Sequence, residues 1–422
     1  MRALALVDTD SYVKWGAALL ARLPADWERE IAVVATPARP SAAQLAAALA
    51  GSGFEPSSVV ETTLDGLAER AARERPDVVI VAMRGPAASV VLRLLADLPD
   101  RPVLVSGLPG ISIPATWKAL FYRAQADLVV LHSKHEIREF GLVAGKRGWT
   151  HRLALATLPF ADAAPVSGGR DVVFAVQSIV PALRAHRERM LDILVDTAVR
   201  NPDHRVVIKV RAVSGEQQTH SEDHSYPDLL SARTGVPENL VVVSGPMADA
   251  LDSAAGLVTV SSTAVIEAVA RGIPVIVVDE FGVTAELINL VFDGSGLAGS
   301  GDDVAALRFA LPHERWLDDN YFHPSSDDDW LEGVRELLAA RELSPLVARR
   351  SLRGGFGGLL RRAWERKQAF GSYDRSALGA VALVVGVPAR RAVLAMRRVT
   401  RRVRGPVGYG REAHAPTGSL DG

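Results

Sequence analysis

The chain has 422 residues, of which 48% are hydrophobic, and its formal net charge is -1. This length exceeds one ordinary hydrophobic core, so we expect two domains and an extension. The absence of cysteine excludes disulfide bonds, thiolate metal sites and a cysteine nucleophile. The first apolar run is too short for a signal peptide, and no run reaches the roughly 20 apolar residues that span a bilayer. These features predict a cytoplasmic protein.

The small net charge conceals an uneven distribution along the sequence. Between Arg349 and Arg411 there are sixteen arginines and lysines but only two acidic residues, Glu365 and Asp374. This segment is therefore strongly basic, and the rest of the chain is acidic. Such a division favours an extension that binds an anionic partner.

Short apolar runs alternate with helical stretches in the first half, as in βαβ units with a parallel sheet. The strands are predicted at 3–7, 31–35, 78–82, 103–106 and 128–131. The helices between them are predicted at 14–23, 41–49, 64–74, 87–98, 113–123 and 134–142. Small residues, proline and glycine in 161–170 then indicate a linker.

The alternation restarts after the linker. Strands are predicted at 172–176, 206–210, 240–243, 256–260 and 275–278, and helices at 181–199, 247–253, 262–271 and 284–291. The fold class is thus α/β with two Rossmann-like lobes, 1–160 and 171–345, each holding an open sheet of about five strands. A basic, helical and partly disordered extension follows at 346–422. Ligands of such sheets bind beyond the carboxyl ends of the strands.

The strongest candidate site is the segment 256–278, whose pattern is strand, hydroxyl-rich turn, helix, glycine and proline-led strand. Ser261 or Ser262 can cap the helix and leave the N–H groups of its first turn free. Together with the helix dipole and the hydroxyl of Thr263, these donors predict a phosphate site. Glu267 lies further along the helix, within reach of a ribose or sugar hydroxyl. The alternative is a capped helix with a solvated Glu267.

The residues Ser-Ser-Thr-Ala-Val-Ile-Glu-Ala-Val-Ala-Arg-Gly-Ile-Pro, from Ser261 to Pro274, resemble the donor-site segment of GT-B glycosyltransferases. The resemblance is strongest to bacterial capsule, sialic-acid and Kdo transferases that use CMP-sugars. The whole chain is similar to an uncharacterised actinobacterial group of glycosyltransferases. Sugar 2-epimerases and polyol-phosphate transferases share the layout of the motif. The resemblance implies a GT-B fold, a CMP- or UDP-sugar donor in the second lobe, no cofactor, and metal-independent inverting transfer.

One departure from that family concerns the second lobe. The sialyltransferases carry a His-Pro pair where this sequence reads Ile208-Lys209-Val210-Arg211. Lys209 and Arg211 share one side of the strand, so they are candidates to neutralise the phosphates, with an exposed strand end as the alternative. Gly245 begins a loop that is either a base-recognition loop or a simple turn.

The first strand ends in the polar run Asp8-Thr9-Asp10-Ser11. A carboxylate at this position is a candidate base for the acceptor hydroxyl, so Asp8 and Asp10 are the predicted catalytic residues. The resembling transferases place their base in an Asp/Glu-Asp/Glu-Gly motif that is absent here. The alternative is that Asp10 or Ser11 only caps the following helix. Ser11 and Lys14 are candidate acceptor contacts.

Three further features complete the prediction. Gly107 and Gly110 belong to a glycine-rich turn that either permits close approach of the acceptor or is a plain loop. His132 is more typical of a structural than of a catalytic histidine. Acidic residues at 327–329 predict capping of a helix at 330–341 rather than a metal site.

The basic segment 389–404 mixes arginine with apolar residues, which suits an amphipathic helix on anionic lipid at the inner face of the plasma membrane. A solvated tail is the alternative, and nothing in the segment favours nucleic acid. The sequence as a whole predicts transfer of a sugar from a nucleotide-sugar donor to a cell-surface glycan or glycolipid. A nucleotide-sugar 2-epimerase, or a non-catalytic partner of a glycan-assembly complex, remains the alternative.

Overall fold

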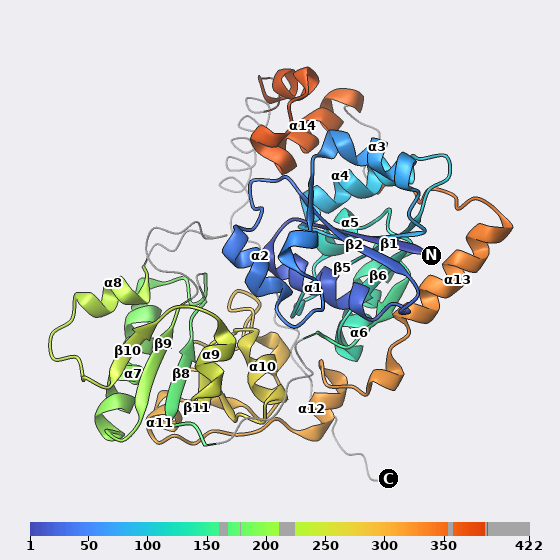
Figure 1. Ribbon diagram of the computed structural model, residues 1–422. Helices are drawn as coiled ribbons and strands as arrows, with labels where there is room; N and C mark the ends of the chain where they lie inside the picture. Colours follow the sequence, from blue (N-terminus) through green and yellow to red (C-terminus); the bar gives the residue numbers. More distant parts are fainter. Residues whose placement is uncertain (160–167, 178, 211–223, 353–357, 385, 387–422) are drawn as a thin grey trace, which may run out of the picture. The chain divides into compact units, whose positions relative to one another are not determined.

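A computed structural model describes residues 1–159, 168–177, 179–210, 224–352, 358–384 and 386. Residues 1–354 form one unit and 355–422 a second, and each is described by itself. The first unit contains two parallel β-sheets flanked by helices, which confirms the predicted α/β class (Figure 1). We call them the N-domain sheet and the C-domain sheet.

The N-domain sheet has seven parallel strands in the order β3-β2-β1-β4-β5-β6-β7. Its strands are β1 (Arg2–Val7), β2 (Glu28–Val34), β3 (Val60–Thr62), β4 (Val78–Ala82), β5 (Val103–Gly107), β6 (Leu128–Leu131) and β7 (Leu153–Leu155). The helices between them are α1 (Asp10–Ala21), α2 (Ala42–Leu49), α3 (Leu64–Glu74), α4 (Gly85–Ala96), α5 (Trp117–Tyr122) and α6 (Lys134–Gly145). A 3₁₀ turn, η1, occupies Pro56–Ser58.

The C-domain sheet repeats this topology with six parallel strands in the order β10-β9-β8-β11-β12-β13. Its strands are β8 (Asp171–Ala175), β9 (Arg205–Lys209), β10 (Leu240–Val243), β11 (Ala254–Thr259), β12 (Val275–Val278) and β13 (Ala298–Gly299). Its helices are α7 (Arg184–Arg200), α8 (Tyr226–Ser231), α9 (Met247–Asp252), α10 (Ala264–Ala270), α11 (Gly301–Ala305) and α12 (Glu314–Asp319). Short 3₁₀ turns lie at η2 (Leu290–Phe292) and η3 (Ser325–Asp327).

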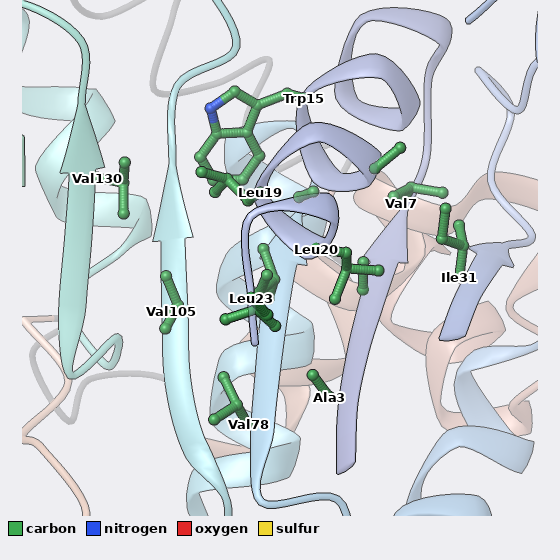
Figure 2. Packing of buried hydrophobic residues seen from close by; sticks show 14 of the residues in the cluster. Ala3, Val7, Trp15, Leu19, Leu20, Leu23, Ile31, Val78, Val105 and Val130 are labelled. Carbon is green, nitrogen blue, oxygen red and sulfur yellow. The ribbon is translucent and has the colours of Figure 1, made fainter. Parts of the chain in front are cut away.

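Continuous apolar runs form these strands because both faces of a parallel sheet are covered by helices. All five residues of β4 are buried, for example. On one face, Trp15, Leu19 and Leu20 of α1 pack over the side chains of β1, β4, β5 and β6 (Figure 2). The carboxyl ends of the strands are thereby left as the edge where loops and helix starts meet.

All ten predicted strands are present, with ends shifted by a few residues at most. Three further strands, β3, β7 and β13, escaped prediction because each has only two or three residues. The helix predicted at 284–291 is wrong, since the described segment contains only the 3₁₀ turn η2. Asn289 instead folds back on this segment, accepting from the N–H of Thr284 and donating to the carbonyl of Gly282.

Helix α13 (Trp330–Leu343) follows the C domain in sequence but packs with the N-domain core. Trp330, Val334 and Leu338 are buried there, and the helix contacts β5, β6 and β7. Figure 1 shows this orange helix beside the blue and cyan strands. The predicted C-terminal lobe boundary at 345 therefore needs correction, because the apolar face of α13 belongs to the first domain.

The acidic residues before α13 serve this packing. Asp328 accepts from the N–H of Thr157 at 2.7 Å, and Asp329 accepts from that of Leu155 at 2.6 Å. Asp329 holds the N-cap position without making a side-chain cap. An acidic residue therefore holds the predicted N-cap position, but the carboxylates of Asp328 and Asp329 bond the end of β7 and Thr157 after it instead of the first turn of the helix.

The second unit contains the helix α14 (Gly358–Phe370) and the 3₁₀ turn η4 (Gly371–Tyr373), in line with the helical extension expected from the sequence. Arg366 pairs with the buried Asp374 at 2.9 Å. The predicted lipid-binding segment 389–404 lies outside the described residues. Within the described part of the chain, no helix is both long and apolar enough to cross a bilayer.

Trp330→Ala tests the return of α13 to the N domain. Removing this buried indole should lower the free energy of unfolding by about 3–5 kcal/mol, measured by urea denaturation. Leu343→Ala on the same helix is the matched control, because Leu343 is 89% exposed and should change little. Equal effects of the two substitutions would contradict this packing.

Candidate active site

The hydroxyl-rich turn lies directly after β11, at the carboxyl end of the C-domain sheet. Ser261 and Ser262 are buried, whereas Thr263 is exposed. Helix α10 begins at Ala264, two residues later than predicted, with Thr263 as its N-cap residue. Ser262, one residue before this cap, accepts a hydrogen bond at its Oγ from the N–H of Ala264 at 3.2 Å, whereas the side chain of Thr263 makes no capping bond.

The backbone N–H groups of this turn are hydrogen-bonded within the protein, although the sequence predicted that they would be free. The N–H of Ser262 donates to Thr259 Oγ1 at 3.1 Å. The N–H groups of Val265 and Ile266 donate to the carbonyls of Ser262 and Thr263 at 3.2 and 3.0 Å. The prediction of free first-turn donors is therefore wrong, because a tight first turn satisfies them. What this turn offers a ligand is chiefly hydroxyl groups and the dipole of α10.

Gln177 is a polar neighbour that the sequence did not indicate. It follows β8, which pairs with β11, so the register of the two strands brings it to Ser261. Ser261 Oγ donates to Gln177 Oε1 at 2.5 Å, and Gln177 Nε2 donates to the Ser261 carbonyl at 2.8 Å. The hydroxyl proton of Ser261 is thereby used within the protein. Only its position after a neighbouring strand could have suggested Gln177.

Lys209 ends β9 and is almost completely buried. Its Nζ donates to the carbonyl of Gly245 at 2.6 Å and to that of Val210 at 2.8 Å. Gly245 has a φ of +104°, a conformation that favours glycine. The structure thus joins two predicted donor residues, with the lysine holding the loop before α9. Arg211 lies outside the described residues.

Predicted acceptor and donor residues also meet across the two domains. Lys14 Nζ on α1 lies 3.6 Å from Glu267 Oε1 on α10. A Cβ atom built on Gly110, in the loop after β5, would lie 3.6 Å from Thr263 Cγ2. Ile111 and Ile113 of that loop pack with the C-domain core. The loops at the carboxyl ends of β1 and β5 therefore face the turn that follows β11.

Asp8, the residue directly after β1, is fully buried. Its Oδ1 accepts from the backbone N–H of Arg84 at 3.1 Å, and its Oδ2 from Arg84 Nε at 3.3 Å. Burial raises the pKa of Asp8, although the charge of Arg84 opposes the shift. Asp8 thus holds Arg84, a partly exposed cation that sequence reasoning missed.

Asp10 is half-buried at the first position of α1. The N-cap residue is Thr9, whose hydroxyl accepts from the N–H of Tyr12, so neither Asp10 nor Ser11 is the cap. The exposed Ser11 donates to Asp10 Oδ1 at 3.4 Å. Of the two predicted carboxylates, Asp10 is the one that solvent reaches.

Arg123 is buried and links the start of α1, the segment after β4 and the end of β5. Its Nε donates to the Gly107 carbonyl at 2.8 Å, and its Nη2 donates to Tyr12 Oη at 2.7 Å and to the Met83 carbonyl at 3.2 Å. Its Nη1 donates to the Ala119 carbonyl at 3.2 Å. Four hydrogen bonds satisfy the guanidinium, as a buried cation requires.

Gly107 owes its identity to packing within the protein. A Cβ atom there would lie 2.5 Å from both the Trp15 ring and the Val130 carbonyl. Trp15 Nε1 donates to His132 Nε2 at 2.6 Å, and His132 Nδ1 donates to the Ala156 carbonyl at 2.7 Å. Burial lowers the pKa of His132 to about 4, so this histidine is neutral and structural, as its isolation in the sequence suggested.

Glu136 is a buried carboxyl that sequence reasoning also missed. Its oxygens accept from the N–H groups of Ser112 and His132 at 2.8 and 2.9 Å and from Tyr321 Oη at 2.7 Å. Burial raises its pKa to about 7. Tyr321 belongs to the C-domain core, so this side chain connects the two domains behind the loop that contains Ser112.

A family model described as "Putative glycosyltransferase (DUF6716)" matches residues 3–337. The chain belongs to this family. No protein of curated function matches the sequence.

Solved structures show the same fold. S. aureus MnaA, solved with UDP, is 11% identical with a TM-score of 0.51, and the match covers 84% of this chain and 100% of MnaA. A UDP-N-acetylglucosamine 2-epimerase is 12% identical with a TM-score of 0.50, covering 82% of this chain and 97% of its own. The family model and these folds bear out the predicted relationship to GT-B glycosyltransferases and the two Rossmann-like domains.

Two buried groups predict opposite dependences of stability on pH. The pKa of Glu136 is raised to about 7 in the folded protein, from 4.5 in the unfolded chain. Its contribution to the free energy of unfolding is therefore fully present below pH 4.5 and is lost as the pH rises toward about 7. The pKa of His132 is lowered to about 4 in the folded protein, from 6.5 in the unfolded chain. Its contribution to the free energy of unfolding is therefore fully present above pH 6.5 and is lost as the pH falls toward about 4. The free energy of unfolding of the parent protein, measured as a function of pH, therefore contains both effects.

Glu136→Gln isolates the first effect. The free energy of unfolding of the parent minus that of the variant should decrease by roughly 2–3 kcal/mol between pH 5 and pH 8, because the variant cannot bind this proton. Urea denaturation at several pH values measures the difference. Glu139→Gln, on the same helix, is the matched control. Parallel curves for the parent and Glu136→Gln would refute the assignment.

Proposed function

We propose that this protein transfers a sugar from a nucleotide-sugar donor to a hydroxyl of a cell-surface glycan or glycolipid. The observation that carries the proposal is the meeting of residues predicted separately for donor and acceptor, Lys14 with Glu267 and Gly110 with Thr263. They lie at the carboxyl ends of two parallel sheets, where α/β domains bind ligands. Membership of a glycosyltransferase family supports the reaction class.

The donor phosphate, in this proposal, binds at the turn after β11. The hydroxyls of Ser262 and Thr263 and the dipole of α10 stabilise the charge that develops on the leaving phosphate, without an obligatory metal. Ser261 positions the turn through Gln177. Glu267 accepts a hydrogen bond from a ribose or sugar hydroxyl.

The base-recognition loop is the segment after β10. Lys209 Nζ donates to the carbonyl of Gly245, so we assign Lys209 the role of holding this loop in its conformation. Arg211 is proposed as the cation that reaches the phosphates. CMP, used by the transferases that the motif resembles, and UDP, found with S. aureus MnaA, are the nucleotides to test first.

Asp10 is the proposed base. In inverting transfer it removes the proton of the acceptor hydroxyl while that oxygen bonds to the anomeric carbon and the nucleotide leaves. Asp8 is a poor candidate because it is fully buried and both its oxygens bind Arg84. We assign Asp8 the positioning of Arg84, and place Ser11, Lys14, Gly107 and Gly110 on the acceptor side.

Asp10→Asn should lower kcat by about 10²–10⁴-fold, because the amide cannot accept the proton. The affinity for nucleotide should stay unchanged, since Asp10 does not contact the donor in this proposal. Nucleotide release from UDP- and CMP-sugars in the presence of membrane extract measures turnover, and calorimetry measures binding. Asp8→Asn is the comparison: if it alone stopped turnover while folding and binding persisted, the base would be Asp8.

Thr263→Val tests the phosphate site. Loss of a hydroxyl that bonds a charged phosphate should weaken nucleotide binding by about 10- to 100-fold, measured by titration calorimetry with UDP, CMP and their sugars. Thr63→Val, at the N-cap of α3, is the matched control because it lies at another helix start. Unchanged affinity in Thr263→Val would move the donor site elsewhere.

A nucleotide-sugar 2-epimerase is the second candidate, favoured by the fold shared with a UDP-N-acetylglucosamine 2-epimerase. An epimerase converts the sugar nucleotide without an acceptor, whereas a transferase releases nucleotide only on transfer or slow hydrolysis. Product analysis without acceptor separates the two. Binding with neither product would indicate a non-catalytic partner of glycan assembly.

The cellular location follows from the same proposal. We infer a cytoplasmic protein held at the inner face of the plasma membrane, in part through the basic segment 389–404. A lipid-linked acceptor would be met at that surface.

A further inference from the structure

One surface of the N domain combines exposed aromatic and cationic side chains. It is formed by α5 and by the last turn of α6 with the segment after it, and we call it the aromatic–basic surface. Trp117 is 40% and Leu142 55% exposed. Helices α5 and α6 contact each other, which brings these side chains into one region. Its residues are Trp117, Lys118, Leu142, Lys146, Arg147 and Trp149.

Ring contacts organise this surface. The Arg147 guanidinium carbon lies 5.1 Å from the centroid of the Trp117 ring and 5.3 Å from that of Trp149. Phe121 contacts both tryptophans, with ring centroids 5.6 Å from Trp117 and 6.3 Å from Trp149. An arginine held against two rings keeps its N–H donors while its apolar stem and the rings form a continuous apolar body.

The cations of this surface lack the partners that cations elsewhere on α6 have. Near the start of that helix, Lys134 pairs with Asp318 at 2.8 Å and Arg138 pairs with Asp319 at 2.6 Å. Among the described residues, Lys118, Lys146 and Arg147 form no ion pair. Two of the six lysines of the chain are therefore gathered here with uncompensated charge.

We propose that the aromatic–basic surface docks on anionic phospholipid. Tryptophan beside lysine and arginine suits a bilayer interface, where the indole lies among headgroups and the cations meet lipid phosphates. Stacking of a glycan or a nucleobase uses open ring faces, and Arg147 occupies part of that area on both indoles. The lipid surface is thus the occupant that matches both the charge and the rings.

The position of this surface bears on the proposed transfer. Helix α5 follows directly the loop that carries Gly110, whose backbone faces Thr263. Docking through Trp117 would hold that loop at the headgroup level, where the hydroxyl of a lipid-linked acceptor is found. This consequence rests on the proposed function, whereas lipid binding itself does not.

Sedimentation of the full chain with vesicles tests the proposal. Phosphatidylglycerol–phosphatidylcholine vesicles should bind the protein, and pure phosphatidylcholine vesicles should bind it much less. Lys118→Gln should reduce partitioning by about five-fold, as expected for one cation near a charged membrane, and Trp117→Ala with Arg147→Gln by more. Arg200→Gln, an exposed arginine of α7, is the matched control and should bind like the parent.

A second measurement locates the contact. Trp15, Trp27, Trp316 and Trp330 are buried, so brominated lipid should quench mainly the remaining tryptophans. Trp117→Phe keeps an aromatic ring and should retain most of the binding while losing part of the quenching. Melting temperatures of all variants show that each is folded.

Three results would overturn the proposal. The first is unchanged partitioning of Lys118→Gln and of the double variant. The second is an equal loss in Arg200→Gln, and the third is complete loss through Arg397→Gln and Arg398→Gln alone. Loss of self-association in the double variant, with vesicle binding intact, would assign the surface to a second copy of the chain. Binding is measured without donor or turnover, so its failure is distinct from a failure of the proposed reaction.

Discussion

A buried arginine determines the shape of the N-domain edge. The guanidinium of Arg123 cannot remain unsatisfied in the core, so the carbonyls of Gly107 and Met83 and the hydroxyl of Tyr12 must lie where its N–H groups point. Gly107 is the last residue of β5, Met83 directly follows β4, and Tyr12 lies in the first turn of α1. One cation therefore positions the segments that carry the proposed acceptor contacts.

The same cation influences the carboxylate beside it. The charge of Arg123 opposes the effect of burial on the pKa of Asp8, as does the charge of Arg84. Asp8 is thus held in a small network of charges rather than presented to a ligand. The network explains why Asp8 is buried and bonded within the protein, whereas solvent reaches its neighbour Asp10.

Most of the fold could be predicted because it depends on local patterns. Apolar runs and helical stretches identify ten strands and the alternation of a parallel fold, and they fail for β3, β7 and β13, which are too short to leave a pattern. The return of α13 to the N domain could not be predicted, because an apolar face in the sequence does not say which core it covers.

The candidate site, too, could be predicted from the sequence only in part. A strand followed by hydroxyl residues marks Ser261–Thr263 from the sequence alone. This kind of pattern does not reveal Gln177, Arg84 or Glu136. The partners of Gln177 and Arg84 lie 76 or more residues away in the sequence, and Tyr321, a partner of Glu136, lies in the other domain. The prediction of free amides at the start of α10 was wrong for a local reason. Residue types do not show whether the first turn of a helix is tight enough to bond its own N–H groups.

The position of α13 also has a consequence for how the chain is made. The last strand of the N-domain sheet ends at Leu155, yet Trp330, Val334 and Leu338 of its core are translated only after the whole C domain. At about 5–20 residues per second, the apolar face that they cover stays open for roughly 10–35 seconds on the ribosome. The domain that is synthesised first is therefore the one that finishes folding last, and a nascent chain halted before α13 would expose it to chaperones.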